Sequence, residues 1–188
     1  MNECNANAVY ETSEDTVFLL RGAEHLIPVQ GLMCEIGCGK GLISAILSEY
    51  GEILATDVNL SAARETLARV RRNNATLHVI CCDRLEPIRE GRVFSLAVFN
   101  PPYLPDESFD PRWYGGPTGV EVPLLFIESI FKRLANGGFI LFLLSSLSAW
   151  KTALKMIGEK GLRVSIIRTF KIGLYEDLLM VLAAKPSV

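Results

Sequence analysis

The sequence predicts an α/β protein built on a mostly parallel sheet whose strands are buried on both faces. Short apolar runs alternate with helical patterns along most of the 188 residues, as in βα units. A glycine-rich turn at 37–41 joins the first apolar run to a helix, and two prolines follow the run Phe94–Phe99. Proline cannot continue a central strand, so the chain leaves the sheet there, at the end where open parallel sheets bind ligands.

The elements can be assigned in order along the chain. A first helix over Glu14–Leu26 has Ser13 as its N-cap and Pro28 beyond its end. Strands are then expected over Leu32–Ile36, Ile53–Thr56, Leu77–Cys81, Phe94–Phe99, Phe139–Leu144, Val164–Phe170 and Leu178–Ala184, and helices over Leu42–Glu49, Ser61–Arg72, Val120–Ala135 and Ala149–Lys160.

The ends of the later elements follow from their connections. Asn136-Gly137-Gly138 is expected to end the helix over Val120–Ala135, whose apolar side includes Leu125. Lys171–Asp177 is too short for a parallel crossover, so the last two strands should pair antiparallel. Because no linker or repeat interrupts the chain, we expect a single domain, with residues 1–30 as an N-terminal cover segment and helix and 31–188 as the core.

Composition narrows the classes of function. The formal net charge is -2, so no global basic field points to nucleic acid. No apolar run reaches transmembrane length and the first residues are no signal peptide, so we expect a cytoplasmic protein without a membrane segment. A mean hydropathy of +0.28 is high, and either a doubly covered sheet or an apolar surface covered by a partner would account for it.

The five cysteines indicate reduced thiols rather than disulfides or a metal site. Their number is odd, and none has convincing metal-ligand spacing. We therefore expect no metal in this chain and small buried hydrophobic side chains at Cys4, Cys34, Cys38, Cys81 and Cys82.

The glycine-rich turn lies between a strand and a helix. Glycines at 37, 39 and 41 let the backbone turn tightly and approach a ligand, and Glu35 precedes them. The spacing differs from the dinucleotide fingerprint, and Lys40 is followed by glycine rather than Ser or Thr, so it is no Walker motif.

Two acids follow the next two strands. Asp57 can accept the ribose hydroxyls of a nucleoside, or it can cap the next helix, although Asn59 or Ser61 could do that. Asp83 can accept the exocyclic amine of adenine, or it is a turn residue before Pro87.

The motif Asn100-Pro101-Pro102-Tyr103 gives the clearest indication of chemistry. The side-chain oxygen of Asn100 and the carbonyl of Pro101 can each accept one N–H of a planar amino group, while Tyr103 stacks on its plane. Both prolines fix φ and limit the motion of these acceptors. The alternative is a plain Pro-Pro turn after a strand.

Two further segments have open interpretations. The long segment Leu104–Gly119 is either a lid or a surface insertion. The helix over Ser61–Arg72 presents Arg64, Arg69, Arg71 and Arg72, which form either a solvated face or a nucleic-acid patch.

Together these features resemble the class I S-adenosylmethionine-dependent methyltransferases, and most closely the HemK-like release-factor glutamine methyltransferases of archaea and eukaryotes. Besides the glycine and NPPY motifs, three segments carry the likeness: Val9–Thr16, which is similar to the opening Y-E-P-x-E-D-T of that branch with Thr12 in place of Pro; Trp113–Gly119, similar to W-x-G-G-x-x-G; and Glu176-Asp177-Leu178, similar to E-x-L.

The resemblance implies a seven-stranded sheet of order 3-2-1-4-5-7-6 with strand 7 antiparallel. It implies S-adenosylmethionine as the cofactor, contacted by or close to Thr16, Glu35, Gly37, Gly39, Gly41, Asp57, Asp83 and Asn100. Its implied substrate is the Gly-Gly-Gln glutamine of a release factor. The alternatives are an adenine or guanine amino-group methyltransferase acting on DNA or RNA, and a non-catalytic cofactor-binding subunit.

The implied strand order leaves Leu77–Cys81 at the edge of the sheet. That segment contains no proline and no full charge, so it offers an unprotected apolar edge to another chain. In this branch a small zinc-binding activator protein commonly docks there. We therefore expect a heterodimer, with the zinc in the partner.

Overall fold

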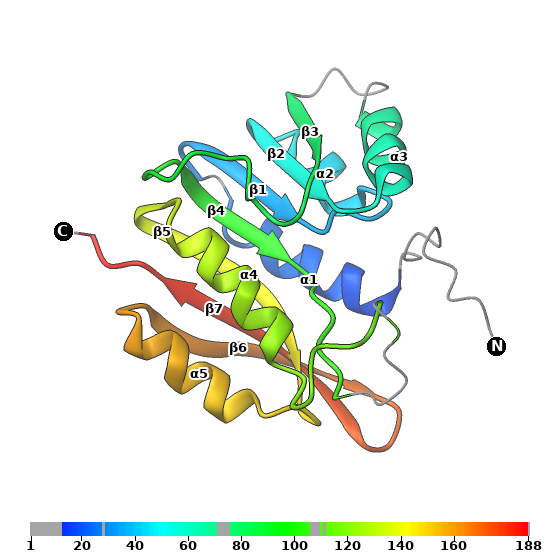
Figure 1. The fold of residues 1–188 in the computed structure, drawn as a ribbon, viewed down its shortest axis with the longest axis vertical. Helices are drawn as coiled ribbons and strands as arrows, with labels where there is room; N and C mark the ends of the chain where they lie inside the picture. Colours follow the sequence, from blue (N-terminus) through cyan, green and yellow to red (C-terminus); the bar gives the residue numbers. More distant parts are fainter. Residues whose placement is uncertain (1–12, 28, 71–75, 106–109, 111, 188) are drawn as a thin grey trace.

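A computed structural model describes residues 13–27, 29–70, 76–105, 110 and 112–187 (Figure 1). They form a seven-stranded sheet of order β3-β2-β1-β4-β5-β7-β6. β7 runs antiparallel to both β5 and β6, and the other pairs are parallel. The predicted α/β fold and strand order are confirmed.

The boundaries of most elements agree with the sequence patterns. The strands are β1 Leu32–Ile36, β2 Ile53–Asp57, β3 Leu77–Cys81, β4 Phe94–Phe99, β5 Leu134–Ser145, β6 Arg163–Ile172 and β7 Glu176–Ala184. The helices are α1 Glu14–Glu24, α2 Leu42–Leu47, α3 Leu60–Val70, α4 Glu121–Phe131 and α5 Trp150–Glu159.

The side chains of the central strands alternate between two apolar layers. On β4, Val98 belongs to the layer under α1 and α2, whereas Phe99 belongs to the layer under α4 and α5. Figure 1 shows α4 and α5 together on one face of the sheet. Residues of α1 such as Leu19 and Ala23 are fully buried in the opposite layer, so this helix covers the sheet as predicted.

The end of α4 was predicted wrongly. Asn136-Gly137-Gly138 does not end a helix but lies inside β5, because Leu134 already joins the ladder opposite Phe94. The register then jumps to Leu96 opposite Phe139, and the extra residues bulge out with Gly137 at a φ of 74°.

Two burial predictions were also wrong. Leu125 of α4 is 49% exposed, and Ile127 is buried in its place. Cys81 is exposed and Cys82 is intermediate, because β3 at the sheet edge has only one neighbouring strand. Cys34 and Cys38 are buried as expected, and Cys4 lies outside the described residues.

This topology brings distant segments together at one edge of the sheet. β2, β1 and β4 are adjacent parallel strands, so the segments that follow their carboxyl ends converge. In the described part of the chain no helix is long and apolar enough to span a membrane.

Candidate functional site

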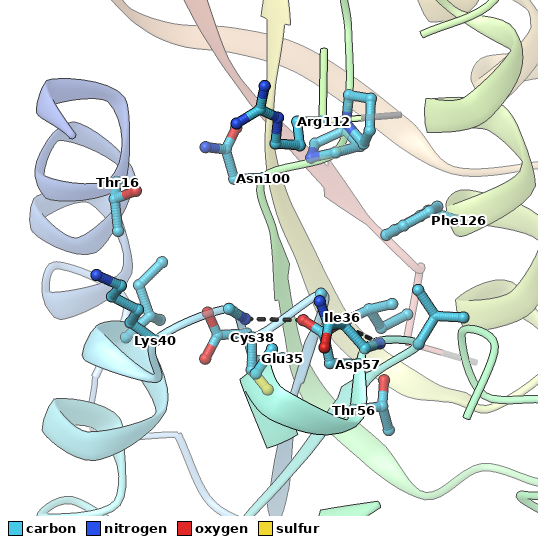
Figure 2. A pocket seen from close by; sticks show the side chains of 18 of the residues that line it. Thr16, Glu35, Ile36, Cys38, Lys40, Thr56, Asp57, Asn100, Arg112 and Phe126 are labelled. Atoms are coloured by element: carbon cyan, nitrogen blue, oxygen red, sulfur yellow. Dashed lines mark hydrogen bonds between the residues drawn. The ribbon is translucent and has the colours of Figure 1, made fainter. Parts of the chain in front are cut away.

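A cavity of about 400 Å³ lies at the carboxyl ends of β1, β2 and β4. Figure 2 shows Thr16, Glu35, Asp57 and Asn100 around it. All the residues selected from the sequence line this cavity, although their roles stay predictions: Thr16, Glu35, Gly37, Gly39, Gly41, Asp57, Asp83, Asn100, Pro101, Pro102 and Tyr103.

The glycine turn forms the floor of the cavity after β1. Gly37, Gly39 and Gly41 have φ values of 73°, 51° and 72°, in the region that favours glycine. A Cβ on Gly41 would also lie 2.8 Å from the Cα of Thr66 on α3. The turn is therefore close-packed on one side and open to a ligand on the other.

Asp57 connects the glycine turn to the start of α3. Its Oδ2 accepts a hydrogen bond from the Gly39 N–H at 2.9 Å and its Oδ1 accepts one from the Asn59 N–H at 2.8 Å. Burial raises the pKa of this carboxyl, although both hydrogen bonds oppose the shift. The Ser61 N–H donates to Asn59 Oδ1, so Asn59 supplies a cap and Asp57 faces the cavity.

Glu35 is buried beneath the turn. Its Oε2 accepts hydrogen bonds from the Ser44 N–H at 2.8 Å and from the Ser44 hydroxyl, which ties the end of β1 to α2. Burial raises the pKa of Glu35 to about 8, even though the bonds from Ser44 lower it. Glu35 thus stabilises the glycine turn by joining the strand before it to the helix after it.

Asp83 lies at the rim rather than deep in the cavity. Its carboxylate pairs with the Arg84 guanidinium at 3.0 Å, and its side chain is 57% exposed. Arg84 adopts a φ of 47°, unusual for a residue with a side chain. Any contact from Asp83 to a ligand would thus be made beside Arg84, which lines the same cavity.

Asn100 has its side-chain amide fixed in orientation. Its Nδ2 donates a hydrogen bond to Asp15 Oδ2 at 2.8 Å. A carboxylate only accepts hydrogen bonds, so this contact assigns the NH2 end of the amide to the side of Asp15. The side-chain oxygen of Asn100 therefore lies on the side away from Asp15. That oxygen, Oδ1, is buried and has no hydrogen-bond partner among the described residues.

Tyr103 and Thr16 contact the same carboxylate. The Tyr103 hydroxyl donates to Asp15 Oδ2 at 3.2 Å, and the Thr16 N–H donates to Asp15 Oδ1 at 2.6 Å. Tyr103 is only 6% exposed and packs in the layer under α1. Its hydroxyl therefore helps to hold Asp15.

Asp15 is the site residue that the sequence reasoning missed. It was included only within the segment Val9–Thr16 and was given no role, because an acid in the first turn of a helix is common. In the structure it is 4% exposed and joins the start of α1 to the end of β4. The available signal was its place in the segment Val9–Thr16, where Asp15 is the D of the motif Y-E-P-x-E-D-T and stands next to Thr16.

The segment after the NPPY motif is held against it. Leu104 donates its N–H to the Trp113 carbonyl at 3.0 Å, and the Gly115 N–H donates to the Leu104 carbonyl at 2.9 Å. A Cβ on Gly115 would lie 2.7 Å from the Cα of Tyr103, so only glycine allows this approach. Trp113 is thereby placed in the cavity wall. Its action as a lid stays a prediction, because 106–109 and 111 lie outside the described residues.

Four cysteines lie in the described part of the chain: Cys34, Cys38, Cys81 and Cys82. Among the residues that the structure describes, no three His, Cys, Asp or Glu side chains are grouped so as to hold a metal ion. Burial raises the pKa of both Cys34 and Cys38, which keeps these thiols protonated.

Comparison with known proteins identifies the family. The model of the methyltransferase small domain matches residues 13–155. The chain belongs to this family. That match contains the glycine turn, the two acids after β2 and β3, and the NPPY motif.

Three similar proteins extend this finding. A protein of Methanocaldococcus jannaschii assigned as a protein N5-glutamine methyltransferase is 32% identical over 183 residues, covering 92% of this chain and 90% of the relative. The eRF1 methyltransferase catalytic subunit mtq2 of Schizosaccharomyces pombe is 28% identical over 160 residues, covering 69% of each chain. Mtq2 in the structure of the E. cuniculi Mtq2–Trm112 complex has a TM-score of 0.77 at 24% identity, covering 94% of this chain and 98% of that one.

We predict that Asp15→Asn lowers the turnover of methyl transfer about tenfold or more. The substitution keeps the shape but removes the charge that orients Asn100, and a hydrogen bond to a charged group contributes about 1.5–3 kcal/mol. The cofactor dissociation constant should change little. Turnover and cofactor binding are measured on the same preparation, with Glu24→Gln as the matched control, because Glu24 is an exposed acid of the same helix that lines neither cavity. Wild-type turnover in a folded Asp15→Asn protein would show that this carboxylate does not position the amide.

We also predict a pH-dependent stability that Glu35 causes. The folded protein keeps the Glu35 proton up to about pH 8, whereas the unfolded chain loses it near 4.5, so the folded state binds more protons between these values. The free energy of unfolding should therefore fall as pH rises through this window, by at most about 1.4 kcal/mol per pH unit.

Denaturant unfolding of the unliganded protein at pH 5, 6, 7 and 8 measures this dependence. Glu35→Gln keeps an oxygen acceptor for Ser44 but never ionises, so its stability should vary less across the series. Glu49→Gln, which removes an exposed carboxylate nearby, should keep the wild-type dependence. Identical slopes for wild type and Glu35→Gln would contradict the assignment.

Proposed function

We propose that this protein is an S-adenosylmethionine-dependent methyltransferase that methylates the side-chain amide nitrogen of a glutamine in a translation termination factor. One observation carries the proposal: the buried Oδ1 of Asn100, which has no partner among the described residues, at the cavity of a methyltransferase-family chain. Buried polar atoms are almost always hydrogen-bonded, so this oxygen is suited to a donor from the substrate.

The cavity fits the cofactor in size and in chemistry. Its volume of about 400 Å³ lies within the usual range for small-molecule sites. Asp57 would accept the ribose hydroxyls, the glycine turn would pass close to the amino-acid portion, and Asp83 would face the adenine from the rim. Thr16 and the buried Glu35 complete the wall on the side of α1 and β1. When bound, the cofactor supplies a methyl group on a sulfonium, which is a strong electrophile.

The residues of this chain orient the acceptor amide for methyl transfer. An amide nitrogen is a poor nucleophile because its lone pair is delocalised into the carbonyl. Asn100 Oδ1 and the Pro101 carbonyl accept its two N–H groups, which concentrates electron density on the nitrogen and stabilises the positive charge that develops there. Pro101 and Pro102 restrict the backbone, and Asp15 restricts the Asn100 side chain, so these acceptors are oriented before the substrate binds.

The relatives support glutamine as the acceptor. The M. jannaschii relative is assigned as a protein N5-glutamine methyltransferase, and the S. pombe relative is named for eRF1. We infer a cytoplasmic location from this substrate, because translation ends there. An adenine or guanine acceptor is less well supported, since the net charge is -2 and the described arginines of α3, Arg64 and Arg69, are isolated exposed cations. A non-catalytic subunit would not need the intact amide-binding motif.

We further propose that a small zinc-binding activator protein docks along β3, with the zinc in that partner. β3 is an edge strand, and its Leu77, Val79 and Ile80 are only half-buried. Beside it, Val58 and Leu60 are 75% and 50% exposed. An apolar edge of this kind favours pairing with another chain, and the similar Mtq2 chain was solved as a complex with Trm112.

We predict that Asn100→Ala lowers turnover by roughly 10²-fold or more, as expected for one preorganised polar contact. Cofactor affinity should change much less, because the variant leaves Asp57 and the glycine turn intact. The assay follows a labelled methyl group from S-adenosylmethionine into a termination factor and, in parallel, into an oligonucleotide. We expect label in the protein, on its glutamine, and none in the oligonucleotide. Transfer to the oligonucleotide alone, or near wild-type transfer by folded Asn100→Ala, would overturn the proposal.

We predict that Val79→Lys abolishes association with the activator. A charge on the apolar edge would have to be desolvated in the interface. Copurification and the oligomeric state after co-expression are the measurements. Leu125→Lys is the control, because it places the same charge on an exposed apolar residue of α4. A wild-type chain that is soluble, monomeric and fully active alone would contradict the docking proposal.

A further inference from the structure

A second cavity of about 260 Å³ lies beside the first. Asp15, Tyr103 and Trp113 line both cavities, so the two share a wall that includes Asp15, the hydrogen-bond partner of Asn100. The second cavity also has Leu104 and Ile172 as apolar walls. It is thus adjacent to the place where the acceptor amide would lie, on the side away from the glycine turn.

Glu176 contributes a carboxylate to this second cavity. It is the first residue of β7 and lies opposite Ile172 on β6. Its Oε1 is buried and has no hydrogen-bond partner among the described residues. Leaving a buried acceptor unpaired costs free energy, and the cost is larger for a charged group. Such an atom requires a donor that the described residues do not provide.

The surface next to the second cavity has exposed apolar side chains that another protein could contact. The turn between β6 and β7 carries Leu174 and Tyr175, which are 80% and 86% exposed. These large apolar side chains stand directly before Glu176 in the chain, and Figure 1 shows the hairpin beside the segment that follows β4. Exposed apolar residues next to a site commonly mark contact with a partner.

We propose that the second cavity is a peptide-binding subsite and that Glu176 Oε1 accepts a main-chain N–H from a residue flanking the acceptor glutamine. This inference rests on the proposed function and names a specificity-determining residue for it. Successive residues of an extended chain lie about 3.3–3.6 Å apart, so a residue flanking a glutamine whose side chain is at Asn100 can reach the wall that the two cavities share. The apolar side chains of Leu104 and Ile172 lower the local dielectric, which strengthens a hydrogen bond to the carboxylate.

The proposed subsite contributes to peptide binding and not to cofactor binding. Glu176 does not line the larger cavity and touches neither the glycine turn nor Asp57 among the contacts described. Its loss should therefore weaken the binding of the protein substrate without weakening the binding of the cofactor.

The test compares Glu176→Leu with wild type on a termination factor and on a short peptide that spans its acceptor glutamine. We expect Glu176→Leu to raise KM about tenfold or more, to change kcat much less, and to leave the S-adenosylmethionine dissociation constant unchanged. Glu176→Gln keeps an oxygen acceptor and should stay closer to wild type. Asp177→Leu removes an exposed carboxylate at the next position and should behave as wild type.

A change in the peptide identifies the donor. Single N-methylation along its main chain should reveal one position at which the loss of the N–H raises KM for wild type but not for Glu176→Leu. The same peptides are titrated against the protein saturated with S-adenosylhomocysteine, which reports binding without methyl transfer. If wild type methylates the factor but Glu176→Leu leaves KM and peptide affinity within twofold, the subsite is wrong while the proposed function stands. If wild type co-expressed with the activator transfers no methyl group to the factor, the proposed function is wrong, and the peptide titration alone decides the subsite.

Discussion

The hydrogen bond from Asn100 to the buried carboxylate of Asp15 is the interaction on which the site depends. It joins two residues 85 positions apart and fixes the end of β4 to the start of α1. Through the same carboxylate, Tyr103 and Thr16 are held as well. Without this contact the side-chain amide of Asn100 could rotate, and its oxygen would lose the fixed direction that a preorganised acceptor needs.

The sheet supplies the frame for that contact. Parallel strands in the order β2, β1 and β4 place their carboxyl ends side by side, so a cofactor site and an amide site form at one edge. The glycine turn and Asp57 line the proposed cofactor site, and the NPPY motif lies between that site and the proposed amide site. β7, inserted antiparallel between β5 and β6, brings Glu176 to the same side of the molecule as Tyr103. The proposed cofactor binding, amide alignment and peptide recognition thus involve residues at the ends of different strands of the sheet.

Much of this arrangement could be predicted from the sequence, because its signals are local. Glycines that favour positive φ and prolines that cannot continue a strand mark the ends of strands. These ends can therefore be predicted without knowing which strands are adjacent. Errors arose where a long-range contact decides the outcome. Asn136-Gly137-Gly138 has the composition of a helix end, yet Leu134 pairs with Phe94 and draws the following residues into β5 as a bulge.

The roles of Asp15 and Glu176 also depend on long-range contacts, so the sequence did not reveal them. An acid in the first turn of a helix is usually there for the helix dipole, and nothing in its spacing reveals a partner 85 residues away. An acid at the start of a strand likewise gives no sign that one of its oxygens is buried without a donor from the described residues. Both features depend on which elements the fold places in contact, so only the three-dimensional arrangement shows them.

A double-mutant cycle between Asp15 and Asn100 tests the central claim most directly, with kcat for methyl transfer to the termination factor as the readout. If Asp15 acts by holding the amide of Asn100, then Asp15→Asn should lower kcat strongly in the wild-type background and by less than about twofold in the Asn100→Ala background. The double variant should then turn over at the rate of Asn100→Ala alone. If the two losses multiply instead, Asp15 acts independently of Asn100, and the account of a preorganised amide acceptor is contradicted.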